Sequence, residues 1–238
     1  MNQLFYTTEI ENGIARLDAE ESRHLLTVLR RREGDRLQMT DGNGFFYEAE
    51  ILEAGKKQAV VRILETHQTP EPAARLHVAI APTKQIDRFE WFLEKATEIG
   101  IQEITPLLCK RSERTAIRHD RLEKILISAM KQSLQSRLPV LHPLTPFKKL
   151  VQQARAPRRF IAWCPDELPP HFMHQLPIAT DALVLIGPEG DFTAEEVALA
   201  QVNEFSPVGL GPTRLRTETA GVLAVAGFQL AQLHLRKA

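Results

Sequence analysis

The stretches "LIGPEGDF" at residues 185–192 and "LGPTRLRTETA" at residues 210–220 share one layout. In each, an apolar strand pattern ends in Gly-Pro and a helical pattern follows. Strands that alternate with helices indicate a mostly parallel sheet with helices on both faces. Because open parallel sheets bind ligands beyond the carboxyl ends of their strands, the two stretches also predict a binding site at their loops.

The same alternation runs through residues 74–238. Apolar runs predict strands at residues 76–82, 103–109, 158–164, 181–187 and 205–211. Apolar stripes at helical spacing predict four helices: Ile86 to Gly100, Leu122 to Met130, Thr193 to about Asn203, and Thr217 to about Leu235. Thr193 and Glu196 have the spacing of a capping box, and Thr217 is expected to cap the last helix.

Residues 1–70 follow the period of strands instead. Alternating runs predict strands at residues 4–9, 13–18, 36–41, 45–52 and 58–65, and "DGNG" at 41–44 predicts a hairpin. One helix is expected after Asp18, with Glu21 completing a capping box and an apolar stripe of Leu25, Val28 and Leu29. These elements predict a small barrel with one helix, separated from residues 74–238 by the proline-containing linker "THQTPEPAARL" at 66–76.

Composition limits the class of protein. The 238 residues are 43% hydrophobic and carry a formal net charge of zero, which is typical of a globular protein and argues against a uniformly basic nucleic-acid binder. No apolar stretch is long enough for a membrane span, and the N-terminus lacks the pattern of a signal peptide, so we expect a cytoplasmic protein. Cys109 and Cys164 have no metal-ligand spacing and are expected to be buried thiols.

The Gly-Pro loops lack the usual signatures of nucleotide binding. No Lys-Ser/Thr follows the glycines, and G-x-G-x-x-G is absent. Glu189 and Asp191 would repel a phosphate group. A neutral or cationic ligand that is recognised by backbone groups therefore suits these loops better.

Long motifs resemble a known family. "LIGPEG", "LGPTRLRTETA" and "TKQIDRFEWFLEKATEIGIQEITPL" at 83–107 resemble the 16S ribosomal RNA (uracil-3-N)-methyltransferases of the SPOUT superfamily, and "HLLTVLR" at 24–30 fits the same family. The resemblance implies an α/β fold: a PUA-like, RNA-binding β-barrel at 1–70 and a SPOUT methyltransferase domain with a C-terminal trefoil knot at 74–238. It also implies a homodimer, S-adenosylmethionine held by the knot loops, and 16S rRNA in the 30S subunit as substrate.

Some positions depart from the family pattern. The usual second glycine after "GPEG" is Asp191, and the "E-Q-S-x-R" motif reads Lys131, Gln132, Ser133, with Gln135 in place of the arginine. An early arginine is absent from "MNQLFYTT". We expect these changes to affect RNA contacts more than the methyl-donor site.

The resemblance assigns the cofactor site to the two Gly-Pro loops. The expected lining is Ile186, Gly187, Pro188, Glu189, Gly190, Leu210, Gly211, Leu215, Thr217, Glu218, Thr219 and Ala220. No metal ion is required, because the sulfonium of the donor is already an activated leaving group.

Two arginines are candidate catalytic residues. Uracil N3 must lose its imide proton, and a guanidinium can stabilise the charge that spreads onto O2 and O4. Arg111 and Arg216 are the candidates. The alternative for Arg111 is a surface salt bridge to Glu113 or Asp120. For Arg216 we favour a bracing pair with Glu189 or Glu218, and the general base stays unassigned.

Bunched basic residues predict phosphate contacts with RNA. Arg30, Arg31, Lys84 and Arg114 are the candidates, although Lys84 is equally explained as a solvated lysine. The target base must be unpaired or extruded, since N3 lies on its Watson-Crick edge. A non-catalytic RNA-binding or ribosome-assembly factor and a small-molecule α/β enzyme with an accessory barrel are the alternative functions.

Overall fold

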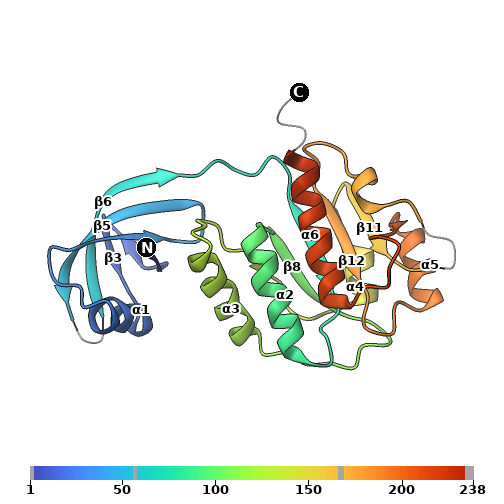
Figure 1. Cartoon of the computed structure of the whole chain (residues 1–238), viewed down its shortest axis with the longest axis horizontal. Helices are drawn as coiled ribbons and strands as arrows, with labels where there is room; N and C mark the ends of the chain where they lie inside the picture. The colour runs from blue at the N-terminus through green and yellow to red at the C-terminus, as the bar shows by residue number, and fades with distance from the viewer. Residues whose placement is uncertain (1–2, 56–57, 166–168, 234–238) are drawn as a thin grey trace. The chain divides into compact units, whose positions relative to one another are not determined.

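The computed structural model describes residues 3–55, 58–165 and 169–233, in two compact units (Figure 1). The first unit comprises Met1–Glu71 and Ile127–Leu138, and the second comprises Pro72–Leu126 and Pro139–Ala238. The break between Glu71 and Pro72 lies within the predicted linker. Residues 127–138 were not predicted to group with the N-terminal unit, and a further boundary falls inside helix α3 (His119–Gln132).

The first unit contains a six-stranded sheet in the order β1-β4-β5-β6-β3-β2. Its strands are β1 (Leu4–Tyr6), β2 (Ile10–Glu11), β3 (Ile14–Arg16), β4 (Arg36–Thr40), β5 (Phe45–Ala54) and β6 (Ala59–Gln68). The predicted hairpin is confirmed, since β4 and β5 pair antiparallel around "DGNG". Within the described ranges β1 and β2 do not pair, so the sheet is a half-barrel, whereas the sequence predicted a small barrel.

The helix of the first unit begins after Asp18 as predicted, but the Glu21 carboxylate pairs with Lys131 and does not complete the predicted capping box, and the winding of the helix then changes. Asp18 Oδ1 accepts a hydrogen bond from Glu21 N at 2.8 Å at the start of α1 (Ala19–Arg23). A π-helical turn, η1 (His24–Val28), follows, in which Leu29 N donates to His24 O. The wider turn shifts the apolar stripe. Leu25 is buried, but Val28 is 62% exposed, so its predicted place in the stripe was wrong.

Lys131, one of the departures from the family pattern, has a partner in this unit. It forms an ion pair with Glu21, whose carboxylate is almost fully buried. The Glu21 side chain also accepts from Tyr6 N at 3.4 Å. The buried carboxylate explains why a lysine is favourable at position 131, since a buried charge needs a partner.

The second unit contains a seven-stranded parallel sheet in the order β10-β8-β7-β12-β11-β13, with β9 paired to β8. Its strands are β7 (Leu76–Ile80), β8 (Glu103–Leu108), β9 (Val140–Leu141), β10 (Thr145–Pro146), β11 (Arg158–Ala162), β12 (Ala182–Ile186) and β13 (Ser206–Val208). The predicted parallel sheet is confirmed. Its central strands are buried on both faces, as expected for a parallel sheet covered by helices.

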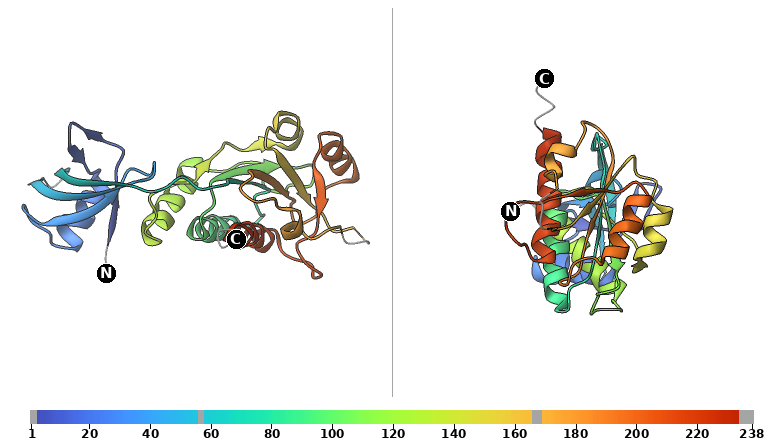
Figure 2. Two further views of the ribbon diagram at one scale, coloured as in Figure 1. Left: turned by 90° about the horizontal axis from the view of Figure 1, so that it is seen from above. Right: turned by 90° about the vertical axis from the view of Figure 1, so that its right-hand side faces the viewer.

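Helices cover the two faces of this sheet (Figure 2). The helices α2 (Ile86–Ile99) and α6 (Thr217–Leu233) pack together on one face, and α4 (Phe147–Gln153) and α5 (Ala194–Val202) lie on the other. A short 3-10 helix, η2 (Phe172–Gln175), packs against α6. In the described part of the chain, no helix has both the length and the apolar character needed to cross a membrane.

The ends of three helices can be compared with the capping residues that the sequence predicted. Gly100 ends α2 in a left-handed conformation with φ 99°, and Thr193 with Glu196 forms the complete capping box of α5, both as predicted. Thr217 differs from the prediction, because it is the first residue of α6 and not its cap. Its hydroxyl instead donates to the carbonyl oxygen of Gly187 at 3.1 Å.

Candidate functional site

A cavity of about 420 Å³ lies at the carboxyl ends of β11, β12 and β13. This is the edge of the sheet at which the sequence predicted a ligand site. The predicted residues that line it are Ile186, Gly187, Pro188, Glu189, Leu210, Gly211, Leu215, Arg216, Thr217 and Ala220. The two Gly-Pro loops, which are distant in sequence, therefore form one hollow.

The remaining predicted cofactor residues lie outside this lining. The carbonyl oxygen of Gly190 accepts a hydrogen bond from Arg111 Nη1 at 2.6 Å. Glu218 is buried in the first turn of α6, and Thr219 is exposed. These three residues are thus not among those that line the cavity.

The turns of the two loops depend on unusual backbone conformations. Gly211 has φ 139°, in a range that side-chain-bearing residues rarely adopt. Asp191 has φ 61° and is also left-handed. Its Oδ1 accepts from Phe192 N at 2.7 Å, and its own N–H donates to Pro188 O. Aspartate tolerates this conformation by such local bonds, so Asp191 can replace a glycine without changing the turn.

Arg88, from α2, holds two carboxylates of the loops. Its Nη1 lies 3.7 Å from Glu189 Oε1, and its Nε lies 4.0 Å from Glu218 Oε1. We expected Arg216 to make one of these pairs. Among the described residues Arg88 makes both, and Arg216 instead is exposed at the cavity.

The Glu218 carboxylate is a buried charge beside the site. Only 8% of its side chain is exposed, and its Oε2 has no hydrogen-bond partner among the described residues. Its place in the first turn of α6 stabilises a negative charge through the helix dipole. Arg88 is therefore the main neutralising group for this carboxylate.

Arg111 contacts the first Gly-Pro loop. Besides its bond to Gly190 O, its aliphatic part lies against Gly190, where an added Cβ would be 3.3 Å from Arg111 Cδ. The carboxylates that we considered as its partners pair elsewhere: Glu113 with Lys84 at 2.7 Å and Asp120 with Arg118 at 3.6 Å. The surface salt bridge proposed for Arg111 is thus not the observed arrangement.

The four predicted RNA-binding residues lie in both units. Arg30 and Arg31 are exposed in the first unit. In the second, Arg114 donates to the carbonyl oxygens of Thr83 and Lys84, at 3.1 and 2.6 Å. The hydrogen bond from Lys84 to Glu113 raises the pKa of Lys84. Lys84 is therefore charged and salt-bridged.

Other lining residues were missed by sequence reasoning. They are Arg88, Ala162, Trp163, Cys164, Asp191, Val208, Thr213 and Arg214. Ala162 to Cys164 end or follow β11, so the carboxyl-end rule could have found them. Cys164 was expected to be buried, but it is exposed at this cavity because its strand ends there. Cys109 is buried as predicted.

Comparison with known proteins gives consistent matches over most of the chain. The profile of a family described as "RNA methyltransferase domain" matches residues 69–229, and one described as "RNA methyltransferase PUA domain" matches residues 17–64. The Ribosomal RNA small subunit methyltransferase E of Synechocystis sp. is 30% identical over 92% of this chain and 73% of that protein.

Solved structures agree with these matches. A protein described as a probable rRNA-methyltransferase from Porphyromonas gingivalis has a TM-score of 0.92 and is 41% identical, covering 98% of this chain and 99% of its own. A Ribosomal RNA small subunit methyltransferase E from Neisseria gonorrhoeae, bound to S-adenosyl methionine, has a TM-score of 0.86 at 27% identity, covering 97% and 98% of the two chains.

Proposed function

This chain belongs to the RNA methyltransferase family, and we propose that it transfers the methyl group of S-adenosylmethionine to N3 of a uridine in 16S rRNA of the small ribosomal subunit. The observation that carries the proposal is the single cavity formed by the two Gly-Pro loops at the carboxyl ends of parallel strands. A related protein with the same fold binds S-adenosyl methionine, which supports this choice of cofactor.

The cavity fits the proposed methyl donor. Its volume of about 420 Å³ lies in the range of small-molecule sites. Apolar side chains of Ile186, Leu210 and Leu215 can cover an adenine ring, and the carboxylates of Glu189 and Asp191 can balance a cation. When bound, the cofactor would supply an activated methyl group on its sulfonium. The cofactor-binding residues that we propose remain those of the two loops, residues 186–190, 210–211, 215 and 217–220.

Arg111 and Arg216 are the proposed catalytic residues. Arg216 lines the cavity and is exposed there, so its guanidinium is free to approach a uracil ring. Arg111 is fixed beside Gly190, and one of its nitrogens is already used in that bond. Both would stabilise the negative charge on O2 and O4 as the imide proton leaves N3.

We propose two further structural features for this function, a knot in the chain and a dimer. We infer a trefoil knot in the C-terminal half. It is supported by the insertion of β12 between β7 and β11 and by the bond that ties Thr217 to Gly187. We also infer a homodimer. Exposed apolar side chains of Trp91 on α2 and of Leu230 and Leu233 on α6 support it.

The two parts of the chain would divide the work. We propose that residues 1–70 bind RNA, which the match of residues 17–64 to a PUA domain supports, and that residues 74–238 bind the donor and perform transfer. Arg30, Arg31, Lys84 and Arg114 would contact phosphates. We place the enzyme in the cytoplasm, with its ribosomal substrate.

A transfer assay tests the proposal. The protein is incubated with methyl-labelled S-adenosylmethionine and with 30S subunits from a strain in which the gene is deleted, and the rRNA is mapped by mass spectrometry. One methyl group at N3 of one uridine is expected. Binding to 30S subunits without transfer would support the assembly-factor alternative. An absence of salt-dependent binding to 30S subunits would support the small-molecule alternative.

The variant Gly187→Val tests whether the first Gly-Pro loop forms part of the donor site. An added Cβ at Gly187 would lie 3.2 Å from the Phe192 ring and 3.3 Å from Asp191 Oδ1, so a larger side chain must displace the loop. We expect this variant to lose donor binding and transfer together. If the variant transferred methyl groups at the wild-type rate, this loop would not be part of the active site.

A further inference from the structure

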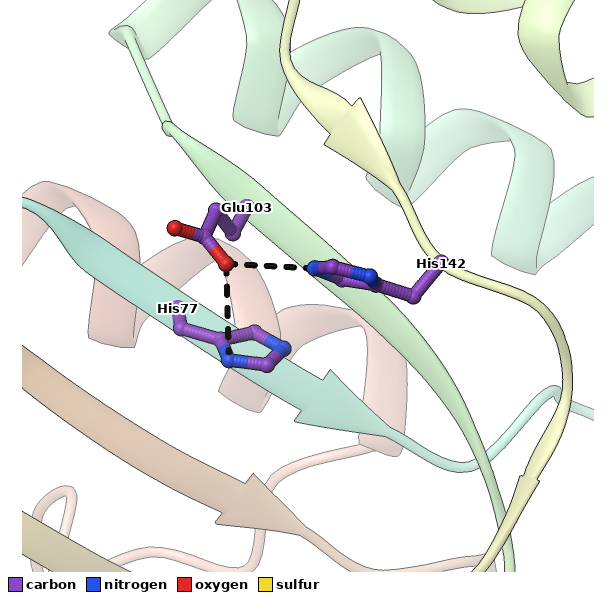
Figure 3. Close-up of side chains that lie close together, drawn as sticks. All are labelled: His77, Glu103 and His142. Atoms are coloured by element: carbon purple, nitrogen blue, oxygen red, sulfur yellow. Dashed lines mark hydrogen bonds and ion pairs between the residues drawn. The ribbon is translucent and has the colours of Figure 1, made fainter. Parts of the chain in front are cut away.

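Three side chains with metal-binding atoms meet in the second unit, where β7 and β8 begin (Figure 3). The cavity instead lies at the carboxyl ends of strands of this parallel sheet. His77 lies near the start of β7, Glu103 is the first residue of β8, and His142 directly follows β9. The backbone fixes their proximity. His77 and Glu103 are register partners, and His142 N donates to Ile104 O at 2.8 Å.

The side chains point toward one another from these positions (Figure 3). Glu103 Oε2 lies 3.1 Å from His142 Nε2 and 3.9 Å from His77 Nδ1. One ligand atom from each residue can be chosen so that all lie within 4.8 Å of one another. Tetrahedral zinc with bonds of about 2.0–2.2 Å places its ligands about 3.4 Å apart, so small side-chain rotations would bring these atoms to coordination distance.

A hydrogen bond orients the His77 ring in a way that suits metal binding. Its Nε2 shares a hydrogen bond of 2.7 Å with the hydroxyl of the buried Thr105, which turns Nδ1 toward Glu103. Metal-binding histidines are commonly oriented by a hydrogen bond on the other ring nitrogen. The 3.9 Å between Nδ1 and the carboxylate exceeds hydrogen-bond length, so no proton bridges these two atoms.

The environment also suits a metal ion. The His77, Glu103 and His142 side chains are 22%, 32% and 37% exposed. An ion can therefore enter from solvent, and a water molecule can complete its coordination.

We propose that His77, Glu103 and His142 bind one Zn²⁺ ion, with solvent as the fourth ligand. Two imidazoles and one carboxylate are a ligand set typical of zinc, whereas Mg²⁺ and Ca²⁺ prefer oxygen ligands alone. The site lies apart from the proposed donor cavity, so it does not alter our expectation that methyl transfer needs no metal. The ion would fasten the segment after β9 to β7 and β8.

Zinc titration of the full-length protein tests the site. After treatment with a chelator and its removal, the protein is titrated with Zn²⁺ in competition with a chromophoric indicator. We expect one ion per chain. His142→Ala and Glu103→Gln should each weaken binding by about 10-fold or more, since each removes one of three protein ligands.

His67→Ala is the matched control. His67 forms a comparable pair with Glu65, 3.3 Å apart, but no third ligand is grouped with them in the described part of the chain. We expect this variant to bind zinc as the wild type does. Circular dichroism of each variant shows whether it is folded, and Glu103→Gln preserves side-chain shape if His142→Ala does not fold.

Cobalt gives an independent readout. Tetrahedral Co²⁺ absorbs strongly in the visible range, and this band should appear with the wild type and be lost with Glu103→Gln. Zinc should also raise the Tm of the wild type and not that of Glu103→Gln. No saturable zinc binding, or binding that both cluster variants leave unchanged, would overturn the proposal and leave the methyltransferase function untouched.

Discussion

The hydroxyl of Thr217 donates a hydrogen bond to the carbonyl oxygen of Gly187 at 3.1 Å, and this contact ties one Gly-Pro loop to the other. Thr217 is the first residue of α6, and Gly187 directly follows β12. Both residues line the same cavity. The bond therefore fixes the distance between the two walls of the proposed donor site.

Removing this bond should weaken donor binding. Thr217→Val keeps the shape of the side chain but leaves the Gly187 carbonyl without its donor, which costs about 1 kcal/mol. We expect the affinity for S-adenosylmethionine, measured by calorimetry, to fall by about 5-fold. Thr217→Ser keeps the hydroxyl and should bind nearly as the wild type does. Equal affinities for the valine and serine variants would show that the bond does not shape the site.

Arg88→Ala should destabilise the fold through Glu218. The pairs of Arg88 are partly exposed and contribute modestly, but their loss leaves the buried Glu218 carboxylate without a counter-ion. We expect a decrease of about 1–2 kcal/mol in the free energy of unfolding, measured with urea. Adding Glu218→Gln to this variant should restore part of that loss. A double variant less stable than Arg88→Ala would contradict this explanation.

Arg111→Ala should separate catalysis from binding. If the guanidinium stabilises the uracil anion, the rate of methyl transfer should fall by about 100-fold or more while donor affinity changes little. Arg111→Lys keeps the charge but not the planar fork and should recover only part of the rate. The opposite pattern, weak donor binding with a nearly normal rate at saturation, would limit Arg111 to holding the Gly190 carbonyl.

Gly221→Ala should destabilise the protein, although alanine normally favours a helix. An added Cβ at Gly221 would lie 2.6 Å from Phe92 Cε2 and 2.7 Å from Ile80 Cδ1, and both side chains are fully buried. Overpacking of this kind costs about 1–3 kcal/mol. Gly227→Ala, in the same helix, would come closest to the flexible Met173, at 3.1 Å, and should be tolerated better. Thermal unfolding compares the two, and equal Tm values would argue against close packing of α2 and α6.

The two thiols should differ in reactivity. Burial raises the pKa of both, but Cys109 is enclosed while Cys164 is exposed at the cavity. A thiol reagent should therefore modify one thiol of the folded protein, and Cys164→Ser should abolish this reaction. Because a raised pKa leaves less thiolate, the reaction should be slower than that of glutathione at pH 8 and should accelerate as pH rises.

The donor should protect Cys164 from this reagent. S-adenosylmethionine that occupies the cavity would cover the thiol, so the rate should fall with donor concentration and approach zero at saturation. Modification of the Cys164→Ser variant, in which Cys109 is the remaining cysteine, checks whether the protein stays folded. If saturating donor did not change the rate of Cys164 modification, the donor would bind outside this cavity.

Local patterns in the sequence determined the elements and the place of the site. Apolar patterns predicted the longer strands, but not the two-residue strands β2, β9 and β10 or the short helix α4. Gly100 and the Thr193–Glu196 box marked helix ends, and the Gly-Pro motifs marked the carboxyl ends where the cavity lies. These signals succeed because they depend on backbone geometry within a few residues. The π-helical turn at His24–Val28 escaped them, since its winding changes without a signal that we identified in the side-chain pattern.

Only the tertiary structure decided which distant side chains meet. Arg88, and not Arg216, pairs with Glu189 and Glu218 because α2 packs beside α6. Cys164 became exposed because β11 ends at the cavity, and His77, Glu103 and His142 met because three parallel segments lie side by side. Such contacts depend on strand order and helix packing, which arise from interactions between residues far apart in the chain, so no local period in the sequence encodes them.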